Sequence, residues 1–265
     1  SLNGGANQLS NIFSGVSFGT YTVQVLDCNN CSATTLLTIA QQSPLTLSLS
    51  ANPILCFAGT TTLVCTASGG TPSYQYSING GPFQTSSSFN NRPNGNYTVV
   101  VSDANNCTES AVIAISQPGA LSVTASATTI LCFGNTTTIT ALASGGTTPS
   151  YSYSLNGGAQ QASNNFTNIA AGNYTVTVFD ANNCSATTTL SITQPTQLQL
   201  SATASSIACN GGSATITALG TGGTTPSYSY QVNGGPWQSS GIFNGLLSGT
   251  YTVAVQDANN CIATS

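Results

Sequence analysis

Apolar and polar residues alternate with a period of two through almost every part of this chain. Residues 174–178 read Tyr-Thr-Val-Thr-Val, which places Tyr174, Val176 and Val178 on one face and two threonines on the other. The same apolar positions recur at residues 97–101 and 251–255. Such alternation is typical of β-strands with one buried face, and no segment shows the 3.6-residue spacing of an amphipathic helix. The pattern predicts an all-β protein.

Turn residues separate the alternating segments. Asn-Gly-Gly supplies the positive φ of a tight hairpin, Gly-Gly-Thr-Pro interrupts the chain between two strands, and Asp-Ala-Asn-Asn closes another hairpin. Phenylalanines recur before the Tyr-Thr-Val strand and are predicted to fill the core at Phe13, Phe89, Phe166 and Phe243. About seven strands in roughly 77 residues is the spacing of an immunoglobulin-like β-sandwich, and Gly-x-Tyr before the penultimate strand suits the tyrosine corner of that fold.

Three unrelated motifs repeat with one period of 76 or 77 residues. The motifs begin at Asn3, Asn79, Asn156 and Asn233 (Asn-Gly-Gly), at Tyr21, Tyr97, Tyr174 and Tyr251 (Tyr-Thr-Val), and at Asp27, Asp103, Asp180 and Asp257 (Asp-x-Asn-Asn-Cys). Gln117-Pro118 and Gln194-Pro195 mark boundaries, because proline ends a strand and stiffens a junction. We therefore expect a partial repeat at 1–42, whole repeats at 43–118 and 119–195, and a repeat at 196–265 without most of its last strand. Short junctions predict a semi-rigid rod.

Charged residues are too few for most kinds of chemistry. The chain has one Arg, five Asp or Glu, and no His or Lys, while 40% of its residues are hydrophobic and can form a core. No paired carboxylates, nucleophile-and-base arrangement or phosphate loop is present, so we expect no enzyme, no cofactor and no metal site. A net charge of −4 over this length gives almost no field to attract nucleic acid or a membrane surface.

Nine cysteines at repeating positions favour an oxidising compartment. Pairing within repeats is the interpretation we favour, since the first strand can fold back. It would join Cys56 to Cys107, Cys132 to Cys184 and Cys209 to Cys261. The alternative follows from an immunoglobulin-like topology, in which the early and late cysteines lie at opposite ends of a repeat. Bonds would then cross the junctions and join Cys56 to Cys184 and Cys132 to Cys261.

A few residues stand apart from the repeat pattern. Cys65 replaces an inward-facing alanine and is expected to be a buried thiol, whereas Cys28 and Cys31 share a hairpin and could pair with each other or with another chain. Phe83 and Trp237 occupy one repeat position after the Asn-Gly-Gly turn and are candidates for glycan or partner contact, although packing against a neighbour also explains them. The Asp-x-Asn-Asn loops offer oxygens to calcium, but capping of the hairpin by the aspartate explains them better.

The ordered motifs together resemble a known family. Cys-Phe-Gly, then Gly-Gly-Thr-Pro-Ser-Tyr-x-Tyr-Ser, then Gly-x-Tyr-Thr-Val-x-Val-x-Asp-Ala-Asn-Asn-Cys, then Gln-Pro, resembles the SprB repeat along the whole chain. Members of that family usually have Asn-Gly-Cys in place of Asn-Asn-Cys and carry more charge. The resemblance implies a repeat region of a large gliding-motility adhesin or related surface protein of the Bacteroidota, exported by the type IX secretion system.

Three functions follow as hypotheses. The first is a non-catalytic, extracellular stalk of a cell-surface adhesin that presents adhesive regions in attachment or gliding. The second is a self-assembling structural filament or surface-layer subunit, since weakly charged surfaces associate easily. The third is a carbohydrate-binding array. The expected partners are neighbouring copies of the same protein or surface polysaccharide, with no nucleic acid and no membrane insertion of this region.

Overall fold

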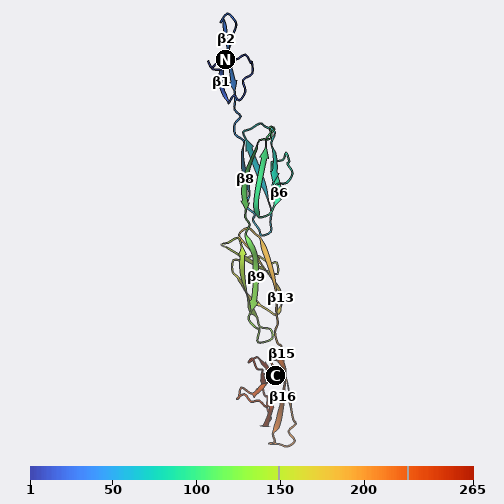
Figure 1. Cartoon of the computed structure of the whole chain (residues 1–265). Helices are drawn as coiled ribbons and strands as arrows, with labels where there is room; N and C mark the ends of the chain where they lie inside the picture. The colour runs from blue at the N-terminus through green and yellow to red at the C-terminus, as the bar shows by residue number, and fades with distance from the viewer. Residues whose placement is uncertain (149, 226) are drawn as a thin grey trace. The chain divides into compact units, whose positions relative to one another are not determined.

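The computed structural model describes residues 1–148, 150–225 and 227–265, so Pro149 and Pro226 of the Gly-Gly-Thr-Thr-Pro segments lie outside the described residues. All regular structure in that part is β-strand, which Figure 1 shows as arrows. It contains no helix that is long and apolar enough to cross a bilayer. The chain forms two compact units, one of residues 1–54 and 58–117, the other of residues 55–57 and 118–265. The all-β prediction is confirmed.

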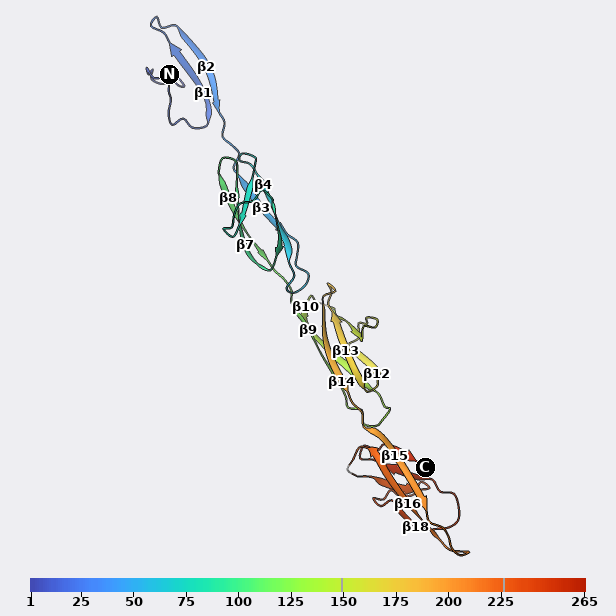
Figure 2. The same ribbon diagram turned by 90° about the vertical axis from the view of Figure 1, so that its right-hand side faces the viewer.

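The first unit contains strands β1 to β8 in three antiparallel sheets. Its strands are β1 (Gly19–Leu26), β2 (Ser32–Ile39), β3 (Thr46–Ala51), β4 (Thr61–Ser68), β5 (Gln75–Ile78), β6 (Ser88–Arg92), β7 (Gly95–Ser102) and β8 (Thr108–Ile115). The sheets have the orders β1-β2, β3-β4-β6 and β5-β7-β8. β3 and β4 lie side by side (Figure 2), and their antiparallel register joins six residue pairs.

The second unit contains strands β9 to β20 in four antiparallel sheets. Its strands are β9 (Gly119–Ala127), β10 (Thr137–Gly146), β11 (Ser152–Leu155), β12 (Asn165–Ile169), β13 (Gly172–Phe179), β14 (Ser185–Ile192), β15 (Thr196–Ala204), β16 (Ala214–Gly223), β17 (Ser229–Val232), β18 (Ile242–Leu246), β19 (Val253–Gln256) and β20 (Ile262–Thr264). The sheets have the orders β9-β10-β12, β11-β13-β14, β15-β16-β18 and β17-β19-β20.

Each set of six strands has the strand order of an immunoglobulin-like sandwich. The first, second and fourth strands form one sheet, and the third, fifth and sixth form the other, as strands A, B, E and C, F, G do in that fold. Six strands per set form in the described residues, rather than about seven. The segment after the Asn-Gly-Gly turn joins its sheet only through a single bridge, such as Tyr76 to Gln84. The predicted domain boundaries and the rod arrangement stay predictions.

The core of each set lies on the predicted inward face of its strands. In the first complete set, Val99 and Val101 on β7 are fully buried, as is Leu63 on β4. Phe89 on β6 packs in the same cluster. Phe166 and Phe243 are buried in the other two sets, whereas Phe13 is only half-buried. The alternation therefore identified the inward face of these strands, because a strand turns successive side chains to opposite faces.

Local motifs form the predicted turns. The phenol of Tyr97 donates a hydrogen bond to the Pro93 carbonyl at 2.9 Å, which is the geometry of a tyrosine corner, and Tyr21, Tyr174 and Tyr251 bond the fourth residue before them in the same way. Asn79 and Gly80 have φ angles of 49° and 73°, as a two-residue hairpin turn requires. Tyrosine corner and hairpin turn together fix the third and fifth strands of each sandwich.

Candidate functional site

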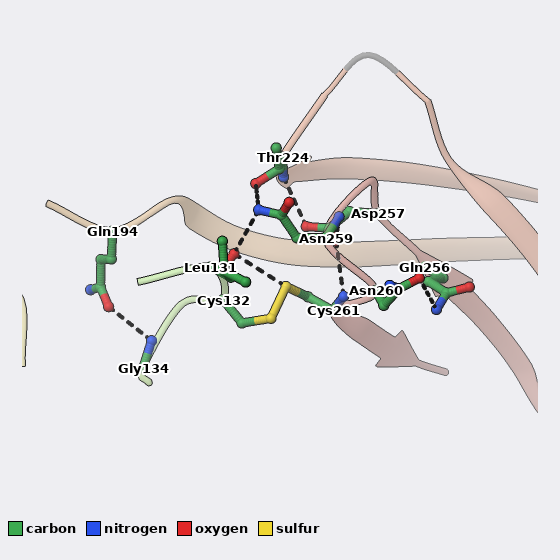
Figure 3. The surroundings of a disulfide bond; sticks show 10 residues. All are labelled: Leu131, Cys132, Gly134, Gln194, Thr224, Gln256, Asp257, Asn259, Asn260 and Cys261. Atoms are coloured by element: carbon green, nitrogen blue, oxygen red, sulfur yellow. Dashed lines mark hydrogen bonds between the residues drawn. A yellow bond between two sulfur atoms is a disulfide. The ribbon is translucent and has the colours of Figure 1, made fainter. Parts of the chain in front are cut away.

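Two disulfides connect loops that are far apart in sequence. Cys56 bonds Cys184 with a Cα–Cα distance of 5.7 Å, and Cys132 bonds Cys261 with a Cα–Cα distance of 5.6 Å. The bonded residues are separated by 128 and 129 positions, which is much more than one repeat of 77. Each bond therefore joins the early cysteine of one repeat to the late cysteine of the next repeat along the chain. Figure 3 shows the second bond and its neighbours.

The favoured pairing of cysteines within repeats is wrong, and the length of one strand explains why. Cys132 precedes β10, whereas the loop of Asp180 that carries Cys184 is hydrogen-bonded to Thr147, directly after β10. β10 has ten residues, so the two cysteines lie about 30 Å apart along it at roughly 3.3 Å per residue. A disulfide needs Cα atoms within about 7 Å. The junction-crossing alternative is the pairing that forms, and Cys107 and Cys209 have no disulfide in the described chain.

An aspartate side chain accepts several hydrogen bonds within each late loop, the Asp-x-Asn-Asn-Cys hairpin that carries the late cysteine of a repeat. The Asp180 carboxylate accepts hydrogen bonds from the backbone N–H groups of Asn182 and Cys184 at 2.9 Å and of Thr147 at 2.8 Å. Asp103 and Asp257 make the same three contacts in their own loops. The carboxylate caps the hairpin, as the sequence indicated, and it also fixes the hairpin to the end of the second strand. It thereby presents the cysteine in a defined position.

The same hydrogen bonds change the acidity of these carboxyls. Burial pushes the pKa of Asp180 upward, but the backbone N–H groups of Thr147, Cys184 and Asn182 outweigh it and lower the pKa overall. The pKa of Asp103 is also lowered, chiefly by the backbone N–H of Thr71. Hydrogen bonds to the charged form favour that form. Both loops therefore keep a carboxylate anion at neutral pH.

An asparagine in the late loop contacts the loop that carries the early cysteine, next to the disulfide. The Asn259 amide donates to the carbonyl of Leu131 at 3.1 Å and to the hydroxyl of Thr224 at 3.0 Å. Figure 3 shows these two contacts beside the Cys132–Cys261 bond. The Cys261 sulfur also lies 3.4 Å from the Leu131 carbonyl oxygen, but a disulfide sulfur carries no proton, so this is a packing contact.

The first disulfide repeats this arrangement in detail. The Asn182 amide donates to the Leu55 carbonyl and to the hydroxyl of Thr147, both at 3.0 Å. Leu55, like Leu131, is the residue immediately before the bonded cysteine. At both disulfides the asparagine and the cysteine therefore hold the loop of the early cysteine, while the threonine hydroxyl positions the asparagine amide. Asn182 and Asn259 occupy the same position of the repeat, and this recurrence is the sequence signal from which their role could have been predicted.

A glutamine at the repeat boundary holds the other side of the early loop. The backbone N–H of Gly134 donates to the Gln194 side-chain oxygen at 2.9 Å, and that of Ala58 donates to Gln117 at 3.0 Å. Both glutamines belong to the Gln-Pro pairs that were interpreted only as boundary markers. Each glutamine therefore ties the early cysteine loop to the end of its own repeat.

The remaining predicted residues lie away from these links. Cys65 is 3% exposed in the core, and burial raises the pKa of its thiol. Cys28 and Cys31 are exposed in the hairpin between β1 and β2, and neither forms a disulfide within the part of the chain that the structure describes. Phe83 and Trp237 follow β5 and β17 and are 48% and 37% exposed. In the part of the chain that the structure describes, no group of three His, Cys, Asp or Glu residues could hold a metal ion.

Two segments of the chain match a family model described as SprB repeat. They are residues 48–83 and 124–160, which cover the same part of two successive repeats, from the first strand of a sandwich to just beyond its Asn-Gly-Gly turn. The resemblance inferred from the motifs is confirmed for these segments. No curated protein matches the sequence.

Solved structures that match this chain have low sequence identity and low TM-scores. The N-terminal eight Ig domains of Down syndrome cell adhesion molecule isoform 1.30.30 are 13% identical with a TM-score of 0.35, and the match covers 94% of this chain and 45% of that chain. The C-terminal 282-residue fragment of intimin, in complex with the intimin-binding domain of its translocated receptor, is 11% identical with a TM-score of 0.35. That match covers 59% of this chain and 66% of the fragment, slightly less than two thirds.

Proposed function

We propose that this chain, with SprB repeats at residues 48–83 and 124–160, is a non-catalytic, force-bearing stalk region of an extracellular bacterial adhesin. The observation that carries the proposal is the overlap of the two disulfide-closed loops. Cys132 lies within the loop that Cys56 and Cys184 close, and Cys184 lies within the loop that Cys132 and Cys261 close. Because the two loops overlap, the two disulfides act together on the covalent path between Cys56 and Cys261.

The overlap shortens the covalent path that carries tension. When the chain is pulled from both ends, force can pass from Cys56 to Cys184, back along the backbone to Cys132, and across to Cys261. Only the segment 132–184 can then extend between the first and last of these residues. The two bonds therefore protect about 150 residues from being drawn out, even if every sandwich in that span unfolds.

The cysteine content and the low charge of the chain support a location at the cell surface. Disulfides persist in oxidising environments such as cell surfaces, and the chain has two of them. Arg92 is the only Lys or Arg in the sequence, and Pro93 follows it, so trypsin-like proteases find no readily cleaved bond; the scarcity of charge also makes the stability of the chain nearly independent of salt. A surface stalk is exposed to proteases and to water of varying ionic strength, so these properties suit it.

Single-molecule stretching between the chain termini tests the proposal. In the oxidised protein we expect the sandwiches to unfold with a restricted gain in length, and reduction to release about 150 further residues, roughly 500 Å at 3.3–3.6 Å per residue. The double variant Cys56→Ser/Cys132→Ser should show the full length with or without reductant. Equal lengths for the oxidised and reduced wild type would contradict the force-bearing role.

A carbohydrate-binding array is the second candidate, because Phe83 and Trp237 follow equivalent turns and remain exposed. Exposed aromatic rings next to polar groups can stack on sugars. A glycan array that compares the wild type with Trp237→Ala distinguishes the two functions. The stalk proposal expects no glycan signal that depends on Trp237, and a signal that the substitution abolishes would favour the array.

A further inference from the structure

The disulfides Cys56–Cys184 and Cys132–Cys261 overlap, and together they divide the chain between Cys56 and Cys261 into three segments. We call these the first, middle and last segments, and they are residues 57–131, 133–183 and 185–260. The Cys56–Cys184 bond spans the first and middle segments, and the Cys132–Cys261 bond spans the middle and last segments. Every peptide bond from Cys56 to Cys261 is therefore spanned by at least one disulfide.

This overlap determines what a cut in the backbone does to the molecule. Hydrolysis adds one water molecule across a single peptide C–N bond and leaves the S–S bonds intact. The two products of a cut in the first segment stay joined through Cys56–Cys184, and those of a cut in the last segment stay joined through Cys132–Cys261. One cut in each of any two segments also leaves a single covalent molecule. Only cuts in all three segments separate the chain, and then into two disulfide-joined parts.

The junctions between repeats lie inside the spanned segments. Ser116 lies between β8 and β9 in the first segment, and Thr193 lies between β14 and β15 in the last segment. Both residues are exposed. Exposed polar residues between elements of regular structure are preferred sites of proteolytic nicking. Pairing of cysteines within repeats would leave both junctions unspanned, so a cut there would divide the chain.

The loop between β9 and β10 offers a second place to cut. Leu131 and Phe133, on either side of Cys132, are 52% and 49% exposed. Chymotrypsin-like proteases bind large apolar side chains in a hydrophobic slot, so these two residues suit them. A cut after Leu131 is spanned by Cys56–Cys184, and a cut after Phe133 is spanned by both bonds. Leu55 is also exposed, but it precedes Cys56, and neither of these two bonds spans a cut there.

We propose that the overlapping disulfides have a second role, which is to keep the chain in one covalent piece after endoproteases cut it at the junctions between repeats or beside Cys132. The role follows from Cys56–Cys184 and Cys132–Cys261 alone, so that nothing outside residues 56–261 enters it. It goes beyond the stalk function, because a cut chain stays joined whether or not it carries tension.

Introduced lysines test the proposal, because the chain itself gives trypsin no readily cleaved bond. Ser116→Lys and Thr193→Lys each create one trypsin site in a spanned junction. Gln41→Lys is the matched control, because it creates an exposed site before β3 that neither disulfide spans. After trypsin treatment of the oxidised variants, denaturing electrophoresis with reductant should show two fragments for all three. Without reductant, Ser116→Lys and Thr193→Lys should give a single band, and Gln41→Lys should still give two.

Removal of one disulfide at a time shows which bond joins which pair of fragments. In a Cys56→Ser background only Cys132–Cys261 remains, so the Ser116→Lys variant should release its fragments without reductant and the Thr193→Lys variant should not. In a Cys132→Ser background only Cys56–Cys184 remains, and the two variants should exchange their behaviour. This reversal distinguishes a covalent join from fragments that merely stay associated.

Multiple cuts test the contribution of the overlap itself. The double variant Ser116→Lys/Thr193→Lys, cut at both junctions, should still give one band without reductant. Addition of Ala159→Lys, at an exposed residue of the middle segment, should separate the cut chain into two disulfide-joined parts. Peptide mapping should identify these parts as residues 1–116 with 160–193, and residues 117–159 with 194–265.

Two results would overturn the proposal. One is release of fragments from Ser116→Lys or Thr193→Lys without reductant, which would mean that the bonds do not span the junctions. The other is a folded chain that trypsin cannot cut at either introduced site and chymotrypsin cannot cut beside Cys132, because a chain that is never cut has no use for this role. The gels carry no load, so they decide this role separately from the stretching experiment.

Discussion

The side-chain amide of Asn259 and the backbone carbonyl of Leu131 form a 3.1 Å hydrogen bond although 128 residues separate them. Leu131 precedes the disulfide-bonded Cys132, and Asn259 lies two residues before Cys261, so one pair of loops is held by a hydrogen bond and a disulfide at once. The hydrogen bond needs no oxidant and can therefore form first. It positions the two thiols for the covalent step.

Removal of this amide should slow formation of the disulfide that it positions. For Asn259→Ala we expect Cys132–Cys261 to re-form several-fold more slowly after reduction, and the oxidised chain to lose about 1 kcal/mol of stability, the usual net contribution of one hydrogen bond. Quenched oxidation followed by peptide mapping measures the rate, and urea unfolding measures the stability.

Asn105→Ala is the matched control for that change. Asn105 makes the same contact with a threonine hydroxyl, but among the described residues it has no contact to the loop of an early cysteine. It should leave the rates of both internal disulfides unchanged. If Asn259→Ala and Asn105→Ala affect the Cys132–Cys261 bond alike, the hydrogen bond to Leu131 has no positioning role.

Loss of one disulfide should destabilise the residues that it encloses. Closure of a loop of about 130 residues stabilises the folded state by about 5 kcal/mol on the chain-entropy model, and measured effects are usually 2–5 kcal/mol. Cys132→Ser should therefore lower the thermal unfolding midpoint of the oxidised protein by many degrees. Cys28→Ser, an exposed residue outside both links, should leave the midpoint unchanged within error.

Much of the fold was predictable because the alternation of apolar and polar residues along a strand indicates which of its faces is buried. Val99 and Val101 were assigned to the core from that alternation and are fully buried. The number of strands was overestimated because it was derived from the spacing of turns, whereas the segment around Gln84 pairs with its sheet through only one bridge. Sequence alternation does not report how many residues of a segment find a partner.

The disulfide pairing was open to sequence reasoning only in part. The repeat gives the same cysteine positions for both pairings, and the choice between them depends on which ends of the sandwich carry the two loops. The length of β10 decides it, and that length is uncertain until the strand ends are known. The role of Asn259 was invisible for a related reason, since its acceptor lies in the preceding repeat.

Acid should weaken the first unit through Asp103. Because hydrogen bonds, first from the Thr71 N–H, lower the pKa of Asp103 in the folded state, the unfolded state binds the proton more readily. The contribution to stability is thus complete above the unfolded pKa of about 3.9 and is lost as pH falls through the lower folded value. Urea midpoints between pH 7 and pH 2 measure this loss.

Asp103→Asn should lower stability at pH 7 and flatten the acid dependence, because the neutral amide keeps no charge to protonate. Glu109→Gln removes a negative charge from an exposed position on β8 and is the control for charge alone. It should retain the wild-type profile in acid. A profile for Asp103→Asn that matches the wild type below pH 4 would show that the carboxylate does not hold this loop.

Glycine is required at Gly145 for two reasons, its positive φ and its close contact with another part of the backbone. Gly157 shares only the first of these and allows the two effects to be measured separately. Gly145 has a φ of 76° in the bulge between β9 and β10, and a Cβ there would overlap the Ala120 carbonyl oxygen. Gly157 has nearly the same φ, 71°, but open space around it. Gly157→Ala should cost roughly 1–2 kcal/mol from backbone strain alone. Gly145→Ala should cost about 1–3 kcal/mol more, because the bulge must also move away from the new methyl group. Urea unfolding of the two variants measures the difference, and equal losses would show that the contact with Ala120 relaxes freely.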